Sequence, residues 1–290
     1  MTADTLVIVG VGLIGGSAGL GARDRGVARR VVGVGRSAES LAAARRAGCI
    51  DDGTPDLAAA ARDADLVLVC TPVDRVAEYV RAAAATCRPG TLLTDAGSTK
   101  DAIVRALDGG LPPGVPFVGG HPLAGSEKRG PEHARADLFD GRLVILTPTP
   151  RTDPAAVERA GAFWRALGAR VLHLSPQDHD DALAVTSHLP HLAAAALANT
   201  LPEHLRSLTA TGFRDTTRVA AGDPDLWAAI FAQNLGAVLA ALGRLEERLT
   251  DYRHAIEHND ITTLRRLLAE AKAVRDGLDE IPNPKHQIPN

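Results

Sequence analysis

A single histidine, His121, stands in a stretch that has neither helical nor strand periodicity. Residues 119–130 read Gly-Gly-His-Pro-Leu-Ala-Gly-Ser-Glu-Lys-Arg-Gly, and these glycines and the proline predict a loop. An imidazole has an unperturbed pKa near about 6.5, so it can accept a hydroxyl proton at neutral pH. His121 is therefore a candidate general base, although a loop histidine taken alone is more often an ordinary surface residue.

A glycine-rich turn near the N-terminus is a second candidate for chemistry. The apolar run 6–9 leads into Gly-Val-Gly-Leu-Ile-Gly, a complete GxGxxG between a predicted strand and a predicted helix. Such glycines permit a tight turn, let the backbone approach a pyrophosphate and let helix pack on strand, while the helix N-terminus offers free N–H groups. The turn predicts a dinucleotide site, to which we assign Gly10, Gly12, Leu13, Ile14, Gly15, Thr71 and Pro72.

The end of the second predicted strand bears on the choice between NAD and NADP. An acidic residue there would bind the ribose 2′-hydroxyl and repel a 2′-phosphate. This chain has Gly35 at that position, followed by Arg36 and Ser37, which are suited to meet a phosphate. The sequence predicts that NADP is preferred; the alternative is that Arg36 is only solvated and that the enzyme takes either cofactor.

Further polar residues suit a small anionic substrate. His188 and His191 are three residues apart on a predicted helix and share a face, and Arg218 can bind a carboxylate through two parallel hydrogen bonds. His121, His188 and His191 could in principle bind a metal, but they do not form an HxxxH pair with a carboxylate, so we predict no metal site. The candidates in this group are Ser98, Ser126, Glu127, Ser187, His188, His191, Asp215 and Arg218.

The first 175 residues contain the elements that must position the dinucleotide site. Short Val/Leu/Ile runs alternate with alanine-rich helical stretches, which is typical of an α/β fold with a doubly wound, mostly parallel Rossmann sheet. We expect strands at 6–10, 31–34, 66–71, 92–95, 117–119, 143–147 and 170–173.

The sequence after Ser175-Pro176 has almost no strand signals. We expect long helices near 176–200, 224–257 and 260–278, with a polar connection at 212–218. Pro190 predicts a kink in the first of these helices. The second would be about 50 Å long and carries an apolar stripe, so we interpret it as a dimer-forming element. The predicted domains are 1–174, which binds the dinucleotide, and 175–290, an all-α substrate and dimerisation domain.

The composition restricts the possible partners. The 290 residues are 45% hydrophobic and 23% charged, with a net charge of −3, so no basic field favours nucleic acid or a membrane surface. The three cysteines show no CxxC spacing, and we expect a reduced cytoplasmic protein. Only four lysines occur against 28 arginines, which hints that Lys100 and Lys128 are kept for an ammonium group.

Five motifs together resemble one enzyme family. GVGLIG, DAGSTK, HPLAGSEKRG, VTSHLPH and FRDTTRVAAGDPDLW, in this order and spacing, resemble the prephenate/arogenate dehydrogenases of tyrosine biosynthesis. The resemblance implies a Rossmann domain joined to a helical domain that interlocks two subunits into a homodimer. It also implies oxidative decarboxylation of a cyclohexadienol carrying a ring carboxylate, with hydride transfer to NAD(P).

The resemblance further implies roles for the candidate residues. His121 would be the base, Ser98 would hydrogen-bond the same hydroxyl, Arg218 would grip a substrate carboxylate, and His191 would meet the side-chain keto acid. Ser126, Ser187 and His188 would complete the substrate pocket. Glu127 and Asp215 would hold Arg218 when substrate is absent.

Several alternatives stay open at this point. Prephenate is favoured as substrate over arogenate, and use of both is the next alternative. A β-hydroxyacid dehydrogenase would need a lysine in the helical domain, but none occurs between Lys128 and Lys272. A dinucleotide-sensing regulator without chemistry would not need His121, the paired histidines and Arg218 together.

Overall fold

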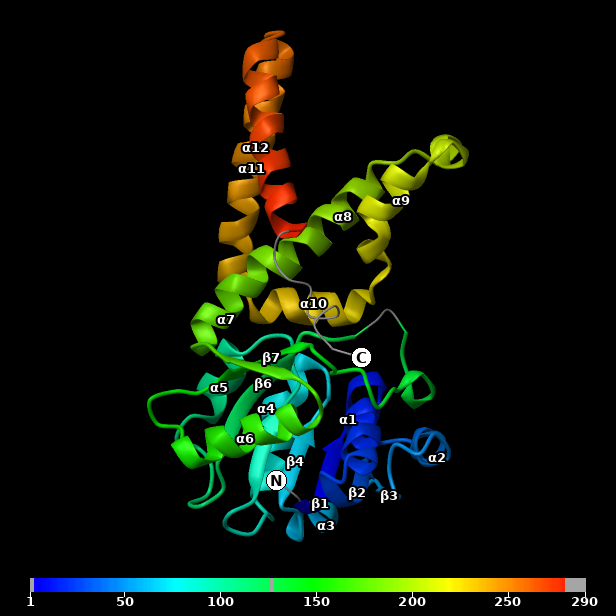
Figure 1. The fold of residues 1–290 in the computed structure, drawn as a ribbon, viewed down its shortest axis with the longest axis vertical. Helices are drawn as coiled ribbons and strands as arrows, with labels where there is room; N and C mark the ends of the chain where they lie inside the picture. Colours follow the sequence, from blue (N-terminus) through cyan, green and yellow to red (C-terminus); the bar gives the residue numbers. More distant parts are fainter. Residues whose placement is uncertain (1–2, 126–127, 280–290) are drawn as a thin grey trace. The chain divides into compact units, whose positions relative to one another are not determined.

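The computed structural model describes residues 3–125 and 128–279. They divide into two compact units, Met1–Leu235 and Gly236–Asn290, which we describe separately. The first unit contains the sheet together with the helices of residues 176–233 (Figure 1). The domain boundary expected at 174/175 stays a prediction, because the first compact unit extends past it.

In the described residues, eight strands form one sheet in the order β3-β2-β1-β4-β5-β6-β7-β8. All neighbouring pairs are parallel except β6 and β7, which confirms the mostly parallel, doubly wound sheet. The strands are β1 (Ala3–Val9), β2 (Ala28–Val34), β3 (Asp52–Thr54), β4 (Leu66–Val69), β5 (Leu92–Asp95), β6 (Phe117–Pro122), β7 (Leu143–Thr147) and β8 (Arg170–His173).

Both faces of the sheet are covered by helices. Leu6 and Ile8 of β1 belong to one hydrophobic core, and the alternating Val7 and Val9 belong to another on the opposite face. Burial on both faces explains why the central strands are continuous apolar runs. The covering helices are α1 (Leu13–Asp24), α2 (Ala38–Arg46), α3 (Leu57–Arg62), α4 (Val76–Ala84), α5 (Asp101–Leu107) and α6 (Pro154–Ala166).

The helical part of the first unit begins as predicted at Ser175, whose Oγ accepts the Asp178 N–H at 3.0 Å. The helix breaks up before Pro190 into a π-helical turn, which confirms an irregularity there. Residues 211–217, expected to be a polar connection, are helical instead. The elements are α7 (Pro176–Leu183), the π-helical turn η3 (Ala184–His188), α8 (Leu189–Asn199), η4 (Glu203–Leu208), α9 (Thr211–Thr217), η5 (Arg218–Ala221) and α10 (Pro224–Gln233).

The prediction of a single helix over 224–257 is wrong. Helix α10 ends at Gln233 and α11 (Leu235–Glu257) begins two residues later, because Asn234 leaves helical geometry with φ −115° and ψ 34°. The Asn234 side-chain amide donates to the Asp180 carbonyl oxygen at 2.7 Å. A buried tertiary hydrogen bond therefore accompanies the break that local periodicity does not reveal.

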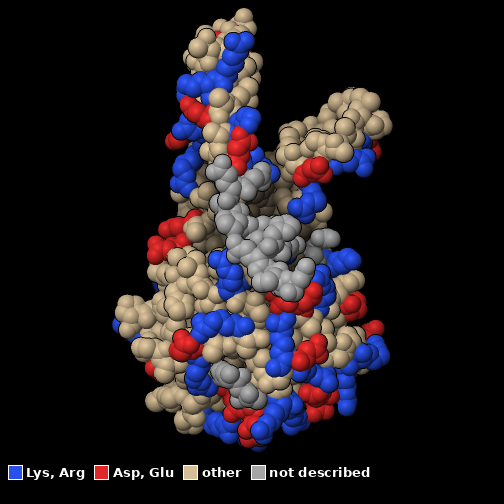
Figure 2. All heavy atoms as spheres, viewed as in Figure 1, with Lys and Arg blue, Asp and Glu red and all other residues tan. Residues whose placement is uncertain are grey.

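The second unit contains the rest of α11 and α12 (Ile261–Asp279), which are joined by a hydrogen bond from the Tyr252 hydroxyl to the Leu267 carbonyl at 3.1 Å. Within the described residues no single helix is long and apolar enough to cross a membrane. The consecutive pair α10 and α11 meets that test only when counted together, by length and composition. On the face in view, acidic and basic side chains are interspersed over the strand-containing part (Figure 2).

Candidate active site

The glycine-rich turn between β1 and α1 borders a cavity of about 940 Å³. Gly10 has a φ of 90°, and a Cβ on Gly15 would lie 2.3 Å from the Gly10 carbonyl oxygen, so neither position accepts a side chain without strain. A Cβ on Gly12 would meet nothing within 4 Å, and Gly12 supplies no side-chain cap to α1. The amides at the start of α1 are therefore open to a pyrophosphate, as the motif requires.

This cavity brings predicted cofactor and substrate residues together. Those that line it are Gly12, Leu13, Ile14, Gly15, Thr71, Pro72, Ser98, His191 and Arg218. The lining also includes Lys128, where a lysine is unusual for this chain, and residues that the sequence analysis did not single out, among them Arg129, Asp223 and Trp227. Residues from the sheet edge and from the helical part thus share one space.

Other predicted residues lie away from this lining. Gly10 and Gly35 directly follow β1 and β2. His121 and His188 are buried, Ser187 is half-buried, and Arg36, Ser37 and Asp215 are exposed. Ser126 and Glu127 lie outside the described residues.

His121 is in a strand, which corrects the loop expected for residues 119–122. Gly119 to Pro122 pair antiparallel with β7, with His121 opposite Ile145. The glycine pair has weak strand propensity, but it serves close packing: a Cβ on Gly120 would lie 2.7 Å from the Asp95 carbonyl oxygen. His121 is thereby held on a rigid element beside the carboxyl end of β5.

Asp95 ties this edge of the sheet together. Its Oδ1 accepts the Gly120 N–H at 3.0 Å and its Oδ2 accepts the Gly97 N–H at 2.8 Å. The Lys100 ammonium forms an ion pair with the same carboxylate, and both side chains are fully buried. The unusual lysine thus neutralises a buried acid, and Asp95 orients both the turn that carries Ser98 and the strand that carries His121.

A buried line of three side chains runs from His121 into the helical part. The His121 Nδ1 lies 2.8 Å from the His179 Nε2, and the His179 Nδ1 lies 2.7 Å from the Asp180 Oδ1. Burial, with the nearby charges of His179, Lys100 and His188, holds the pKa of His121 well below its usual value. His121 is therefore a neutral imidazole at pH 7.

Sequence analysis missed His179 and Asp180. They follow the helix start at Ser175, but nothing local shows that this turn faces β6. Their residue types argued against burial, because His and Asp are rarely fully buried. In the structure, however, His179 is 0% exposed and Asp180 is 1% exposed.

The π-helical turn and α8 carry the paired histidines. His188 is buried, its Nδ1 lies 3.2 Å from the Asn234 Nδ2, and burial lowers its pKa to about 4. The His191 ring stacks on Trp227 with centroids 3.6 Å apart, and burial lowers its pKa. The His191 Nδ1 is buried without a hydrogen-bond partner within the described residues, while other atoms of His191 line the cavity.

Arg218 lies at the start of η5 and lines the cavity as an exposed side chain. In residues 3–125 and 128–279 no ion pair joins it to Asp215. Arg129 instead pairs with Asp223, which also caps α10 by accepting the Leu226 N–H at 2.9 Å. This ion pair connects the loop after β6 to the helical wall of the cavity.

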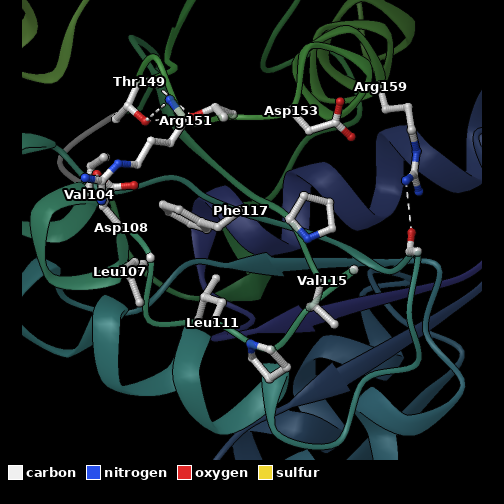
Figure 3. Close-up of a pocket in the computed structure, with 16 residues that line it drawn as sticks. Val104, Leu107, Asp108, Leu111, Val115, Phe117, Thr149, Arg151, Asp153 and Arg159 are labelled. Atoms are coloured by element: carbon white, nitrogen blue, oxygen red, sulfur yellow. Dashed lines mark hydrogen bonds and ion pairs between the residues drawn. The ribbon is translucent and has the colours of Figure 1, made fainter.

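A second cavity of about 450 Å³ lies at the amino ends of β5 and β6 (Figure 3). Its arginines are already engaged: Arg151 lies 3.6 Å from Asp108, and Arg159 donates to the Gly90 carbonyl at 2.9 Å. None of the predicted site residues lines it. Among the described residues, no group of three or more His, Cys, Asp or Glu could hold a metal ion.

Comparison with known proteins assigns the family. The model of the prephenate dehydrogenase nucleotide-binding domain matches residues 18–173, and that of the prephenate dehydrogenase dimerization domain matches residues 175–270. The chain belongs to the prephenate dehydrogenase family. It is 35% identical to prephenate dehydrogenase of Bacillus subtilis over 95% of this chain and 76% of the relative.

Two further proteins support the same assignment. Cyclohexadienyl dehydrogenase of Zymomonas mobilis is 34% identical over 93% of this chain and 94% of its own length. The crystal structure of prephenate dehydrogenase from Aquifex aeolicus with hydroxyphenyl propionate and NAD+ superposes with a TM-score of 0.90 at 34% identity, covering 96% of this chain and 99% of that one. The chain is thus an NAD(P)-dependent oxidoreductase of the prephenate/arogenate dehydrogenase family.

Proposed function

We propose that this protein oxidatively decarboxylates prephenate to 4-hydroxyphenylpyruvate and that it prefers NADP. One observation carries the substrate proposal: a single cavity is lined by the dinucleotide turn, by Ser98 and by Arg218 and His191 of the helical part. A nucleotide, a hydroxyl group and an anionic group can therefore bind within reach of one another.

We assign the chemistry to these side chains together with His121, which is buried behind the cavity lining. His121 accepts the proton of the ring hydroxyl, and Ser98 hydrogen-bonds the same oxygen. A dinucleotide held at the turn of Gly10, Gly12 and Gly15 would supply the hydride acceptor for the carbon that carries the hydroxyl. The resulting dienone is a vinylogous β-keto acid, so the bond to the ring carboxylate breaks, carbon dioxide leaves and the electron pair completes an aromatic ring. Arg218 and His191 bind and orient the substrate, and the Asp95 network holds His121 and Ser98 in position.

Prephenate is favoured over arogenate by the charge of the cavity wall. The two substrates differ by a keto group and an ammonium group on the side chain. His191 lines the cavity, whereas Asp215, which could pair with an ammonium group, is exposed and outside the lining. Arg218 adds positive charge to the cavity lining, which suits a keto acid better than an ammonium group.

The preference for NADP rests on the residues after β2. Gly35 carries no carboxylate to repel a 2′-phosphate. Arg36 is exposed and has no ion pair within the part of the chain that the structure describes. Ser37 starts α2, where its Oγ accepts the Ser40 N–H at 3.3 Å. The Aquifex relative was solved with NAD+, so a preference for NAD is the competing outcome.

Initial rates over a two-by-two grid of prephenate or arogenate with NADP or NAD test both parts. We expect the highest kcat/KM with prephenate and NADP. Turnover of arogenate alone would overturn the substrate proposal, a strong preference for NAD would overturn the cofactor proposal, and no turnover in any combination would overturn the function.

We also propose a homodimer formed through the helical part. The family model that matches residues 175–270 is a dimerization domain, and α11 and α12 expose large apolar side chains. Those more than half exposed on these helices are Leu235, Leu239, Leu249, Ile256, Leu268, Val274 and Leu278. Light scattering of the purified protein should give twice the 30.2 kDa chain mass, and a monomer at micromolar concentration would contradict this. The cytoplasmic location stays a prediction.

A further inference from the structure

Two buried residues behind His121 control which of its ring nitrogens carries a proton. His121 is 8% exposed, His179 is 0% and Asp180 is 1%, so water does not compete for their hydrogen bonds. Contacts of 2.8 Å and 2.7 Å link the three side chains in a row. Because each ring nitrogen in the row faces one partner, the donor and acceptor roles can be assigned in order.

The order starts at Asp180. Its Oδ1 accepts the Lys100 backbone N–H at 2.8 Å, and its Oδ2 accepts the Asp101 N–H at 3.0 Å. A carboxylate that receives backbone donors on both oxygens is stabilised in its ionised, acceptor-only form. The His179 Nδ1, which faces the Asp180 Oδ1, must therefore be the donor in that contact.

The assignment then passes through His179. Burial lowers the pKa of His179 despite the opposing effect of Asp180, so the ring is neutral at pH 7. A neutral imidazole whose Nδ1 carries the proton has a lone pair on Nε2. That lone pair faces the His121 Nδ1, which must donate, and the His121 Nε2 is left unprotonated.

We propose that His179 and Asp180 are positioning residues that hold His121 in its Nδ1–H form, so that Nε2 is the basic atom of the reaction. This deepens the proposed function and rests on it. When the His121 Nε2 accepts the substrate's hydroxyl proton, the new cation keeps its Nδ1–H hydrogen bond to the His179 Nε2. The Asp180 carboxylate two positions along the row stabilises that positive charge.

The surrounding charged and titratable groups are compatible with this role. Asp180, Asp95, Lys100 and His188 act electrostatically on the two imidazoles. Lys100 is ion-paired with Asp95, and the His188 Nδ1 accepts a hydrogen bond from the Asn234 amide at 3.2 Å. Of these groups, Asp180 is therefore the carboxylate that directly contacts one of the two imidazoles, that of His179.

Two substitutions at the same position separate orientation from packing. His179→Leu removes both the acceptor for His121 and the donor for Asp180. His179→Gln can supply an amide oxygen to His121 and an amide N–H to Asp180. Wrong-tautomer variants of a comparable imidazole–carboxylate pair lose about 10⁴-fold in kcat. Here we expect about a 10²-fold loss of kcat for the leucine variant at unchanged KM for the dinucleotide, and a loss below about tenfold for the glutamine variant. His173→Ala, at an exposed histidine that ends β8, is the control and should match wild type.

A spectroscopic measurement tests the proposal without turnover. In protein labelled with ¹⁵N-histidine, two-bond proton–nitrogen correlations separate protonated from unprotonated ring nitrogens, and His121→Asn identifies the His121 signals. We expect a protonated Nδ1 and an unprotonated Nε2 for His121 in the wild type, and a mixed or inverted pattern in His179→Leu.

Each outcome decides the proposal. An Nε2-protonated His121 in the wild type would overturn it, even if the leucine variant fails to fold. A folded leucine variant with kcat within threefold of wild type would also overturn it. If the wild type shows the expected tautomer but turns over no substrate, the proposed function fails while the positioning assignment stands.

Discussion

The sheet edge that carries His121 and the helical wall of the 940 Å³ cavity treat their polar groups in opposite ways; Ser98 of that edge lines the cavity, whereas Asp95 and His121 lie behind the lining. On the sheet edge, Asp95 and the Nδ1 of His121 are buried and hydrogen-bonded to protein groups. On the helical wall, Arg218 is exposed without an ion pair to Asp215, and the buried His191 Nδ1 has no partner in the described residues. The difference indicates that the sheet edge is organised in advance for proton transfer, whereas Arg218 of the helical wall is exposed and open to an anionic ligand.

Removing the base should have the largest effect. His121→Asn keeps a polar side chain in β6 but cannot accept the proton, so kcat should fall by about 10²–10⁴, while the dissociation constant of the dinucleotide stays unchanged. Steady-state rates and fluorescence titration measure the two quantities. His133→Asn, at an exposed histidine, is the control. If kcat stayed within threefold of the wild-type value, His121 would not be the base, and the sheet edge would not be specialised for proton transfer.

Truncating the opposite wall should affect binding and not chemistry. Arg218→Ala removes a charge-assisted hydrogen-bonding group, typically about 1.5–3 kcal/mol, so KM for prephenate should rise by about 10- to 100-fold with little change in kcat. Arg218→Lys should recover only part of the affinity, because an ammonium cannot form two parallel bonds. Arg214→Ala, an exposed arginine on α9, is the control. A fall in kcat at unchanged KM would mean that Arg218 acts in the chemical step and not in substrate binding.

The smallest effect on the kinetic constants should come from Arg36, which belongs to neither the sheet edge nor the helical wall. Arg36→Ala should raise KM for NADP by about tenfold, as expected for one lost phosphate contact, and leave KM for NAD and kcat unchanged. Arg46→Ala, at the end of the same helix α2, controls for loss of surface charge. Equal changes with both cofactors would mean that Arg36 does not distinguish them.

The sheet and its dinucleotide turn were predictable because their signals are local. Continuous apolar runs follow from burial on both faces, and the glycine positions follow from backbone geometry around a single turn. β3, with only Asp52–Thr54, was missed because three residues carry no periodicity. The continuation of the predicted strand 117–119 to Pro122 was missed because the pairing of these residues comes from β7, more than twenty residues later.

The candidate site was predictable only in part, for a related reason. Ser98, His191 and Arg218 were found as chemistry-bearing side chains and line one cavity. The residues that position the base were not found, because His179 acts only through its contact with His121, 58 residues away in the chain. The break at Asn234 depends likewise on a hydrogen bond to Asp180, 54 residues away. Such long-range polar contacts leave no trace in local periodicity.

The pH dependence of kcat/KM for prephenate tests the central claim, a buried neutral imidazole as base, most directly. A base must be unprotonated, and burial holds the pKa of His121 well below its usual 6.5. The rate should therefore stay constant as the pH falls through 6.5 and decline only in more acidic solution, through a single protonation that is absent from the residual activity of His121→Asn. A decline centred at or above 6.5, or an acid limb that persists in His121→Asn, would contradict the account.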